Sequence, residues 1–253
     1  MPRHIHIEAV GDVAVVRIDR PPANALDLDL LAEGHAVREQ LAGEEPGAAV
    51  MTGRERFFSA GMDLKAAPEL SPPEQRRTVD GINRLFSGWY AFPRPVVAAV
   101  NGHAIAGGLI LALCADRRVC AEGDGKLGLT ELRAGIPYPA AAIAVVRAEL
   151  GAAAARRLVL GAELMAPAEA LELGVVDELA APDELLPRAL EVANGLAELP
   201  RSTYAVVKRQ LRAPTIDAIE RVLSGGAGDP VLGTWIGDDT RAAAASLLPG
   251  GGS

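Results

Sequence analysis

The most apolar segment of the chain, residues 95–115, has nearly the length of a membrane-spanning helix, but polar and glycine residues interrupt it. Asn101 and Gly102 divide the segment, and the pair Gly107-Gly108 follows shortly afterwards. These breaks favour a strand, a turn and a helix inside a protein core over a membrane span. We therefore expect a buried strand over residues 95–100 and a helix from Gly107, with no membrane as partner.

Strand and helix patterns alternate along the first half of the chain. Two β-rich runs, residues 5–10 and 12–18, flank Gly11 and predict a hairpin. Asp27 can cap the helix that follows, and residues 48–52 have the composition of a buried strand. Such alternation predicts an α/β fold with crossover connections.

The second half of the chain is mostly helical. Ser71 and Glu74 form a capping box that begins a helix to about Trp89, and residues 117–121 predict a further strand. Later helices are expected over residues 140–150, 152–160, 168–173, 185–199, 202–211 and 216–223, with one strand over 175–179. We interpret residues 1–198 as the core and residues 199–253 as a helical C-terminal region with a frayed end.

The charge balance and the cysteines limit the classes of function. A net charge of -8, without a block of Lys or Arg, argues against nucleic acid as the main partner. Cys114 and Cys120 lie among apolar residues, which predicts reduced core thiols, and no set of residues has the spacing of metal ligands. The N-terminus lacks the pattern of a signal peptide, so we expect a cytoplasmic protein.

Three short segments could carry chemistry. Gly61 follows a strand and lets a ligand approach the backbone, where the Met62 N–H can donate a hydrogen bond. Gly107 begins a helix, whose first N–H groups are also free to donate. Glu131 lies among apolar residues, a setting that raises a carboxyl pKa. Each segment also has an ordinary interpretation: a turn, a close helix contact and a solvated carboxylate.

Taken together and in this order, the three segments resemble the crotonase (enoyl-CoA hydratase/isomerase) family, over residues from about Ile5 to Leu211. Residues 21–26 resemble the family's coenzyme A segment, and residues 59–64 and 101–108 resemble its two oxyanion-hole loops. The resemblance implies an α/β spiral of β-β-α turns with a C-terminal helical region. It also implies assembly as a homotrimer or hexamer, in which residues 199–253 serve as a lid or an oligomerisation region.

The resemblance also assigns roles to residues of this chain. The N–H groups of Met62 and Gly107 would hold the thioester oxygen, and Glu131 would be the catalytic acid/base. Contacts with coenzyme A are implied for Ala23, Asn24, Leu26, Ala60, Met62, Asp63, Leu64, Lys65 and Gly107. The substrate pocket would include Gly108, Ile110, Leu132 and Tyr138. Lys208 or Arg209 would approach coenzyme A, which is part of the thioester substrate, so no separate cofactor is expected.

Two departures from the family pattern bear on the reaction. Ile110 stands where typical hydratases have a glutamate, and Tyr138 lies where a glycine-rich turn is usual. Hydration shares its work between two carboxylates, whereas moving a double bond from the β,γ to the α,β position needs one base. The chain is therefore similar to the single-glutamate enoyl-CoA isomerases.

Three alternatives stay open at this point. The first two are a hydratase and an acyl-CoA hydrolase, in which a second acid such as Glu69, Glu74 or Asp80 would enter the pocket. The third, from a different class, is a non-catalytic homologue that binds acyl-CoA.

Overall fold

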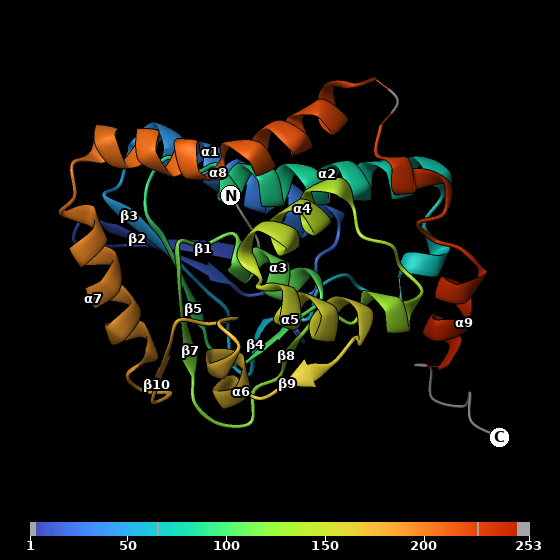
Figure 1. The fold of residues 1–253 in the computed structure, drawn as a ribbon, viewed down its shortest axis with the longest axis horizontal. Helices are drawn as coiled ribbons and strands as arrows, with labels where there is room; N and C mark the ends of the chain where they lie inside the picture. The colour runs from blue at the N-terminus through green and yellow to red at the C-terminus, as the bar shows by residue number, and fades with distance from the viewer. Residues whose placement is uncertain (1–3, 65, 227, 247–253) are drawn as a thin grey trace.

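The computed structural model describes residues 4–64, 66–226 and 228–246 (Figure 1). Its larger sheet has six strands in the order β1-β2-β3-β5-β7-β10. Their bounds are β1 (Ile5–Val10), β2 (Val13–Ile18), β3 (Ala48–Thr52), β5 (Val96–Val100), β7 (Arg117–Ala121) and β10 (Glu178–Ala180). The β1–β2 pair is the predicted antiparallel hairpin, and the remaining neighbours pair in parallel.

A second, smaller sheet has the order β4-β6-β8-β9. Its strands are β4 (Phe57–Ser59), β6 (His103–Ile105), β8 (Leu127–Gly128) and β9 (Leu164–Met165). The chain passes from β3 to β4, from β5 to β6 and from β7 to β8, so each turn gives one strand to each sheet. Helix α3 follows β6 directly, and α2 follows β4 after a loop and a 3-10 turn, which confirms the predicted spiral of β-β-α turns. These short strands were not predicted, because two or three residues carry almost no periodicity.

Helices cover both faces of the larger sheet (Figure 1). The helices of the core are α1 (Leu28–Glu44), α2 (Pro72–Tyr90), α3 (Gly107–Leu113), α4 (Ala140–Glu149), α5 (Ala152–Ala155), α6 (Pro167–Glu172) and α7 (Leu185–Ala197). Side chains alternate between the two faces of a strand. In β2, Val13 and Val15 belong to the apolar layer under α7, whereas Ala14 and Val16 belong to the main core on the other face.

The predicted start signals of two helices are confirmed. The Asp27 side chain accepts a hydrogen bond of 2.8 Å from the Leu30 N–H at the start of α1. At the start of α2, the Glu74 carboxylate accepts one of 2.9 Å from the Ser71 N–H. Both bonds occupy backbone donors that would otherwise be unpaired at a helix N-terminus.

The longest helix of the C-terminal region differs from the prediction. Residues 202–211 and 216–223 do not form separate helices but belong to one helix, α8 (Arg201–Ser224), with Pro214 inside it. Proline removes a helical hydrogen bond. The Arg212 guanidinium nevertheless donates to the carbonyl oxygens of Tyr90 (2.8 Å) and Ala115 (2.9 Å), which anchors the middle of α8 to the core. Tertiary contacts therefore outweigh the local effect of proline.

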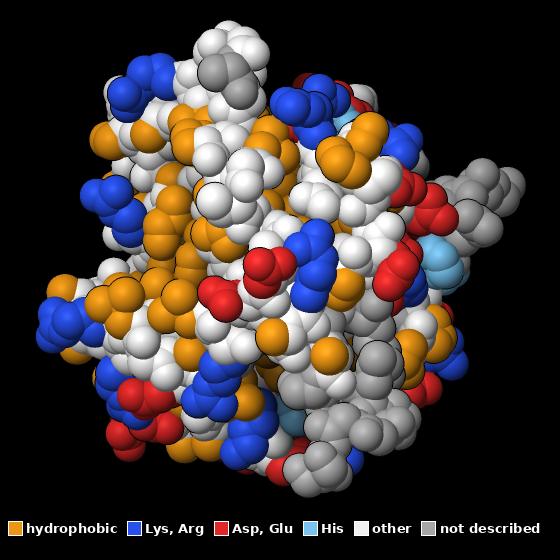
Figure 2. Space-filling model, turned by 90° about the vertical axis from the view of Figure 1, so that its right-hand side faces the viewer, with side chains coloured by type: hydrophobic (Ala, Val, Ile, Leu, Met, Phe, Trp, Pro, Cys, Tyr) orange, Lys and Arg blue, Asp and Glu red, His pale blue; other side chains and the backbone are white. Residues whose placement is uncertain are grey.

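The expected helix over residues 152–160 is present as α5 followed by a π-helical turn (Arg156–Leu160). Helix α9 (Asp238–Ser246) and the 3-10 turns Ala67–Glu69, Glu131–Ala134 and Pro230–Gly233 were not predicted. The predicted frayed end, residues 248–253, lies outside the described residues. Within the described ranges, no helix combines the length and apolar character that a bilayer crossing requires. Figure 2 shows Lys and Arg side chains interspersed with Asp and Glu on the face that it presents, without a continuous basic patch there.

Candidate active site

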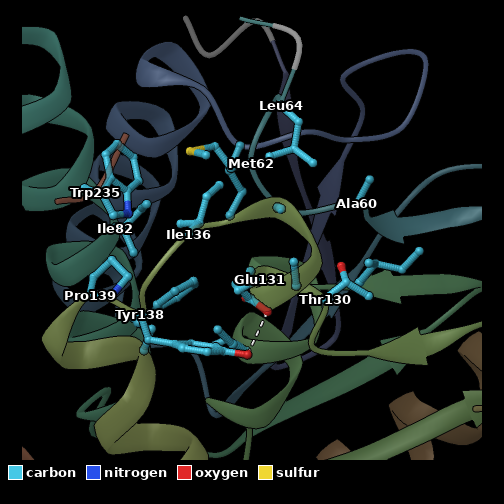
Figure 3. Close-up of a pocket in the computed structure, with 18 residues that line it drawn as sticks. Ala60, Met62, Leu64, Ile82, Thr130, Glu131, Ile136, Tyr138, Pro139 and Trp235 are labelled. Atoms are coloured by element: carbon cyan, nitrogen blue, oxygen red, sulfur yellow. Dashed lines mark hydrogen bonds between the residues drawn. The ribbon is translucent and has the colours of Figure 1, made fainter. Parts of the chain in front are cut away.

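A largely apolar cavity of about 140 Å³ lies between the two oxyanion-hole loops expected from the sequence and the turn that carries Glu131 (Figure 3). Glu131 begins the 3-10 turn Glu131–Ala134, directly after β8. The cavity is lined by Leu26, Ala60, Met62, Leu64, Ile82, Phe86, Ile105, Ala106, Gly107, Ile110, Thr130, Glu131, Ala134, Ile136, Tyr138, Pro139, Ala142 and Trp235. One carboxylate, Glu131, is present in this described lining, and no cationic side chain is.

The Glu131 carboxyl group is buried, with only 8% of the residue exposed. Burial disfavours the charged form and raises the pKa of Glu131 to about 7. The Tyr138 hydroxyl donates a hydrogen bond of 2.9 Å to Glu131 Oε2, which favours the charged form and limits the rise. Burial and the adjacent carboxylate raise the pKa of Tyr138, so its phenol remains a donor. Glu131 can therefore both accept and return a proton near neutral pH.

This raised pKa predicts how stability depends on pH. Glu131 is a weaker acid in the folded protein than in the unfolded chain, so its stabilising contribution is complete below pH 4.5 and is lost as pH rises through about 7. Glutamine does not ionise, so Glu131→Gln loses no stability from this side chain as pH rises. We expect Glu131→Gln to exceed the wild type in free energy of unfolding by about 3 kcal/mol at about pH 9, and to match it at about pH 4. Urea unfolding at both pH values would measure this, and an equal difference at both would contradict it.

Met62 and Gly107 both line the cavity and can offer backbone N–H groups to it. Leu26 and Met62 form an isolated parallel bridge, in which the Leu26 N–H donates to the Gly61 carbonyl at 2.7 Å. Gly107 is the first residue of α3. Within the described part of the chain, neither the Met62 N–H nor the Gly107 N–H donates to a protein acceptor. Both remain available to a ligand oxygen.

Gly61 brings these two donors together. Its φ is +76°, and a Cβ atom built on it would lie 2.8 Å from the Gly107 nitrogen and 2.8 Å from the Ile105 carbonyl oxygen. Only glycine has both this backbone conformation and this closeness to the α3 N-terminus. Ala106, immediately before Gly107, also has a positive φ of 52°. Strain of this kind persists where the surrounding structure fixes the backbone, as it does at many active sites.

The residues predicted to contact coenzyme A separate into two groups. Cavity-lining positions are held by Leu26, Ala60, Met62, Leu64 and Gly107. Asn24 is instead buried, and its side chain accepts from the Arg20 N–H (2.8 Å) and donates to the Phe57 carbonyl (2.9 Å). That amide shapes the turn before Leu26. The Ala23 carbonyl accepts a hydrogen bond of 3.0 Å from the Ala60 N–H. Asp63 lines an open groove that shares Leu26 and Met62 with the cavity, and Lys65 lies outside the described residues.

The predicted pocket residues Ile110 and Tyr138 line the cavity, but Gly108 and Leu132 do not. Gly108 faces β4, since a Cβ built on it would lie 2.1 Å from the Ser59 carbonyl oxygen. Leu132 is 53% exposed, because the 3-10 turn that directs Glu131 inward directs the next side chain outward. Neither residue borders this cavity, and their contact with a substrate stays a prediction.

Lys208, one of the two residues expected near coenzyme A, is paired with protein groups. Its Nζ lies 2.7 Å from the Asp116 carboxylate and 3.0 Å from the Arg94 carbonyl, and the residue is buried. Burial lowers the pKa of Lys208 to about 8, and the ion pair with Asp116 opposes that shift. The neighbouring Arg209 is exposed, with its guanidinium 3.8 Å from Asp217. Lys208 holds α8 on the core.

Trp235, between the last 3-10 turn and α9, was missed by sequence reasoning. It lines the cavity although it lies far from Glu131 along the chain. The Asp229 carboxylate fixes this segment by accepting from Asn83 Nδ2 (2.8 Å) and from the Ala140 N–H (2.7 Å). A hydrogen bond of 2.8 Å from Thr240 Oγ1 to the Gly135 carbonyl fixes the start of α9. In the sequence, the only feature near Trp235 that indicates structure is a turn at Asp229. This turn does not identify Asn83 or Ala140 as the partners of the Asp229 carboxylate.

The acids weighed as second catalytic groups lie elsewhere. Glu74 caps α2, Asp80 lines an external groove with Arg77 and Arg84, and Glu69 ends a 3-10 turn. Among the residues that the structure describes, no His, Cys, Asp or Glu cluster could hold a metal ion. The cavity therefore presents one acid/base group opposite two backbone donors.

Comparison with known proteins agrees with this geometry. The family model for enoyl-CoA hydratase/isomerase matches residues 8–227. Carnitinyl-CoA dehydratase of Salmonella paratyphi B is 34% identical over 222 residues, covering 87% of this chain and 84% of that protein. A Mycobacterium tuberculosis structure described as probable enoyl-CoA hydratase EchA3 is 30% identical with a TM-score of 0.82, covering 88% of this chain and 94% of that one.

A second Mycobacterium tuberculosis structure is described as an enoyl-CoA isomerase. It is also 30% identical, with a TM-score of 0.81, and covers 87% of this chain and 96% of that one. The chain belongs to the enoyl-CoA hydratase/isomerase family, the crotonases. It is an enzyme of the type that acts on coenzyme A thioesters.

Proposed function

We propose that the enzyme moves the double bond of a β,γ-enoyl-CoA to the α,β position, with Glu131 as its single acid/base. The observation that carries this proposal is the described cavity lining, in which Glu131 is the one carboxylate. Its pKa of about 7 suits a group that must take up and release a proton in each cycle. An isomerisation has this requirement and needs no second acid.

In the proposed mechanism, the thioester oxygen accepts hydrogen bonds from the N–H groups of Met62 and Gly107. Glu131 removes a proton from the α carbon, and the electron pair of that C–H bond forms the enolate. The enolate electrons then form the α,β double bond, the β,γ pair takes the proton at the γ carbon, and Glu131 is again a carboxylate. Each N–H donor contributes about 3 to 4 kcal/mol of barrier lowering in comparable sites.

The apolar surroundings of Glu131 support isomerisation over water addition. Ile110 is buried and lines the cavity at the position where the family resemblance places a second glutamate in hydratases. Its side chain can neither orient nor deprotonate a water molecule. Tyr138 donates its hydrogen bond to Glu131. Its pKa is raised, so the phenol stays protonated near neutral pH and cannot act as a base.

The product mass tests this proposal. Incubation with a β,γ-enoyl-CoA should give a conjugated product of unchanged mass, seen by chromatography coupled to mass spectrometry. A product heavier by one water would show hydration instead, and release of free coenzyme A would show hydrolysis. Either of those outcomes as the main reaction would contradict the isomerase.

Hydration or dehydration of an enoyl-CoA is the second candidate function. The observation that favours it is the 34% identity with proteins named carnitinyl-CoA dehydratase. A non-catalytic acyl-CoA-binding role is the third, and Glu131 counts against it. A binding site gains nothing from burying a carboxyl whose charged form is disfavoured.

Tyr138 should change the pKa of Glu131 without itself acting as the base. Replacing Tyr138 by Phe removes a hydrogen bond that lowers the Glu131 pKa, so this pKa should rise further above about 7. The low-pH limb of kcat/KM should then move to higher pH, with activity at about pH 7 falling several-fold and recovering at about pH 9. Tyr90→Phe is the matched control, because Tyr90 donates to Glu149 at 3.0 Å outside the cavity. A limb that stays in place in Tyr138→Phe would contradict this prediction.

We also propose that the C-terminal region, residues 199–253, acts as a lid and contributes to assembly. Trp235 supports the lid role because it lies in the cavity wall. For assembly, α8 exposes Val206, Val207 and the 80% exposed Leu211. Exposed apolar side chains this close together are typical of subunit contacts. Sedimentation equilibrium should give a trimer or a hexamer, and a stable monomer would contradict the prediction.

A further inference from the structure

The cavity is small for an acyl chain. Its volume of about 140 Å³ is close to that of an engineered protein cavity that holds one benzene molecule, so it has room for about six carbon atoms. In the proposed mechanism, the thioester carbonyl group lies beside Met62 and Gly107, and the α, β and γ carbons lie near Glu131. These atoms take up most of the space, which leaves room for about one or two further carbons of the chain.

The two sides of the cavity differ in exposure. Ala60 and Thr130 are partly exposed, which marks a side from which coenzyme A can extend into solvent. Figure 3 shows Trp235 and Ile82 on the other side of Glu131. Trp235 is 1% exposed and Ile82 is 7% exposed. An acyl chain that enters beside Thr130 and passes Glu131 therefore meets buried side chains and not solvent.

Trp235 is a fixed part of this wall. The Asp229 carboxylate joins its segment to α2 and to the start of α4, and the Thr240 hydroxyl donates to the Gly135 carbonyl at 2.8 Å. These hydrogen bonds attach the segment to the core on both sides of Trp235. Because a close-packed interior yields little to compression, a longer chain cannot push the indole aside without breaking them.

Tyr138 and Pro139 also line the cavity, and both are partly exposed. The Tyr138 hydroxyl donates to Glu131 at 2.9 Å, which holds the aromatic ring across this part of the wall (Figure 3). A chain that left the cavity here would have to separate Tyr138 from Glu131, and so would disturb the catalytic base.

We infer that Trp235 ends the acyl cavity and restricts the enzyme to short-chain substrates, with acyl groups of about four to six carbons. This inference rests on the proposed function for the position of the thioester in the cavity. It gives the substrate a class, short-chain enoyl-CoA. Trp235 is then a specificity-determining residue and takes no part in the proton transfer.

Calorimetry with unreactive saturated acyl-CoA thioesters, from butanoyl to dodecanoyl, tests the inference separately from catalysis. If the cavity continued past Trp235, each further CH₂ group would increase the affinity by about fourfold. A chain that does not fit instead loses the burial of its other carbons as well. The wild type should therefore bind decanoyl-CoA and dodecanoyl-CoA at least about tenfold more weakly than hexanoyl-CoA. An affinity that stays level or rises from hexanoyl to dodecanoyl would overturn the inference.

Variants of the wall test the role of Trp235 itself. Trp235→Leu removes the indole, so this variant should bind octanoyl-CoA at least as tightly as hexanoyl-CoA. Ile82→Ala opens the same side of the cavity and should show the same shift, which covers the case in which Trp235→Leu does not fold. Trp89→Phe, at a buried indole outside this cavity, should keep the wild-type limit.

Two results separate the inference from the proposed function. An unchanged length limit in folded Trp235→Leu, or in Ile82→Ala where Trp235→Leu does not fold, would overturn the role of Trp235 alone. Absence of any thioester binding by the wild type would overturn the proposed function with it.

Discussion

Glu131→Gln is expected to lower kcat for β,γ-enoyl-CoA isomerisation by about 10²- to 10⁴-fold. Glutamine has nearly the same shape, so it keeps the cavity closed, but it cannot take a proton from the α carbon. Binding of the thioester should persist, because the N–H groups of Met62 and Gly107 are unchanged. Steady-state kinetics with a β,γ-enoyl-CoA, together with calorimetry of a saturated acyl-CoA, would measure both effects.

The control for this variant is Glu122→Gln, an exposed glutamate between β7 and β8. It makes the same chemical change away from the cavity and should retain wild-type kcat. Wild-type turnover in Glu131→Gln would remove Glu131 from the mechanism. Loss of both turnover and binding would show instead that the carboxyl supports the shape of the site.

Gly61→Ala is expected to lower kcat by about 10²- to 10³-fold, the effect of losing one oxyanion donor. The new Cβ would lie 2.8 Å from the Gly107 nitrogen, and alanine disfavours the φ of +76° at this position. The Met62 N–H and the Gly107 N–H would then move apart, so that a single oxygen could not bind both. Kinetics and thermal unfolding, measured in parallel, separate this effect from a general loss of stability.

Gly195→Ala is the matched control, because a Cβ built there, within α7, meets no atom within 4 Å. Alanine favours a helix over glycine by up to about 1 kcal/mol, so this variant should be as stable as the wild type or more stable. It should also be fully active. Full activity in Gly61→Ala would show that the two N–H groups do not act together.

The long buried strands could be predicted from the sequence with little error. The predicted strands 48–52 and 117–121 have the bounds of β3 and β7. In β3, the continuous apolar run 48–51 is typical of a buried parallel strand. The continuity of α8 through Pro214 could not be predicted. It depends on Arg212 contacting the carbonyl groups of Tyr90 and Cys114, which are distant along the chain.

The candidate site was predictable where the sequence itself requires an unusual residue. Gly61 and Gly107 mark places where backbone meets backbone, and Glu131 is a lone acid among apolar neighbours. The sequence around Trp235 has no comparable feature. Its place in the cavity results from the buried Asp229 carboxylate, which pairs with α2 and α4 through the tertiary fold. Contacts of this kind have no local signature in a sequence.

The absorbance of the conjugated enoyl thioester, followed across a pH series, tests the central claim most directly. With a β,γ-enoyl-CoA, the wild type should raise this absorbance at a rate that increases as pH passes through about 7, where Glu131 loses its proton. Glu131→Gln should show no comparable rise at any pH. A wild-type enzyme that leaves this substrate unchanged, but lowers the absorbance of an α,β-enoyl-CoA, would contradict the isomerase and establish a hydratase.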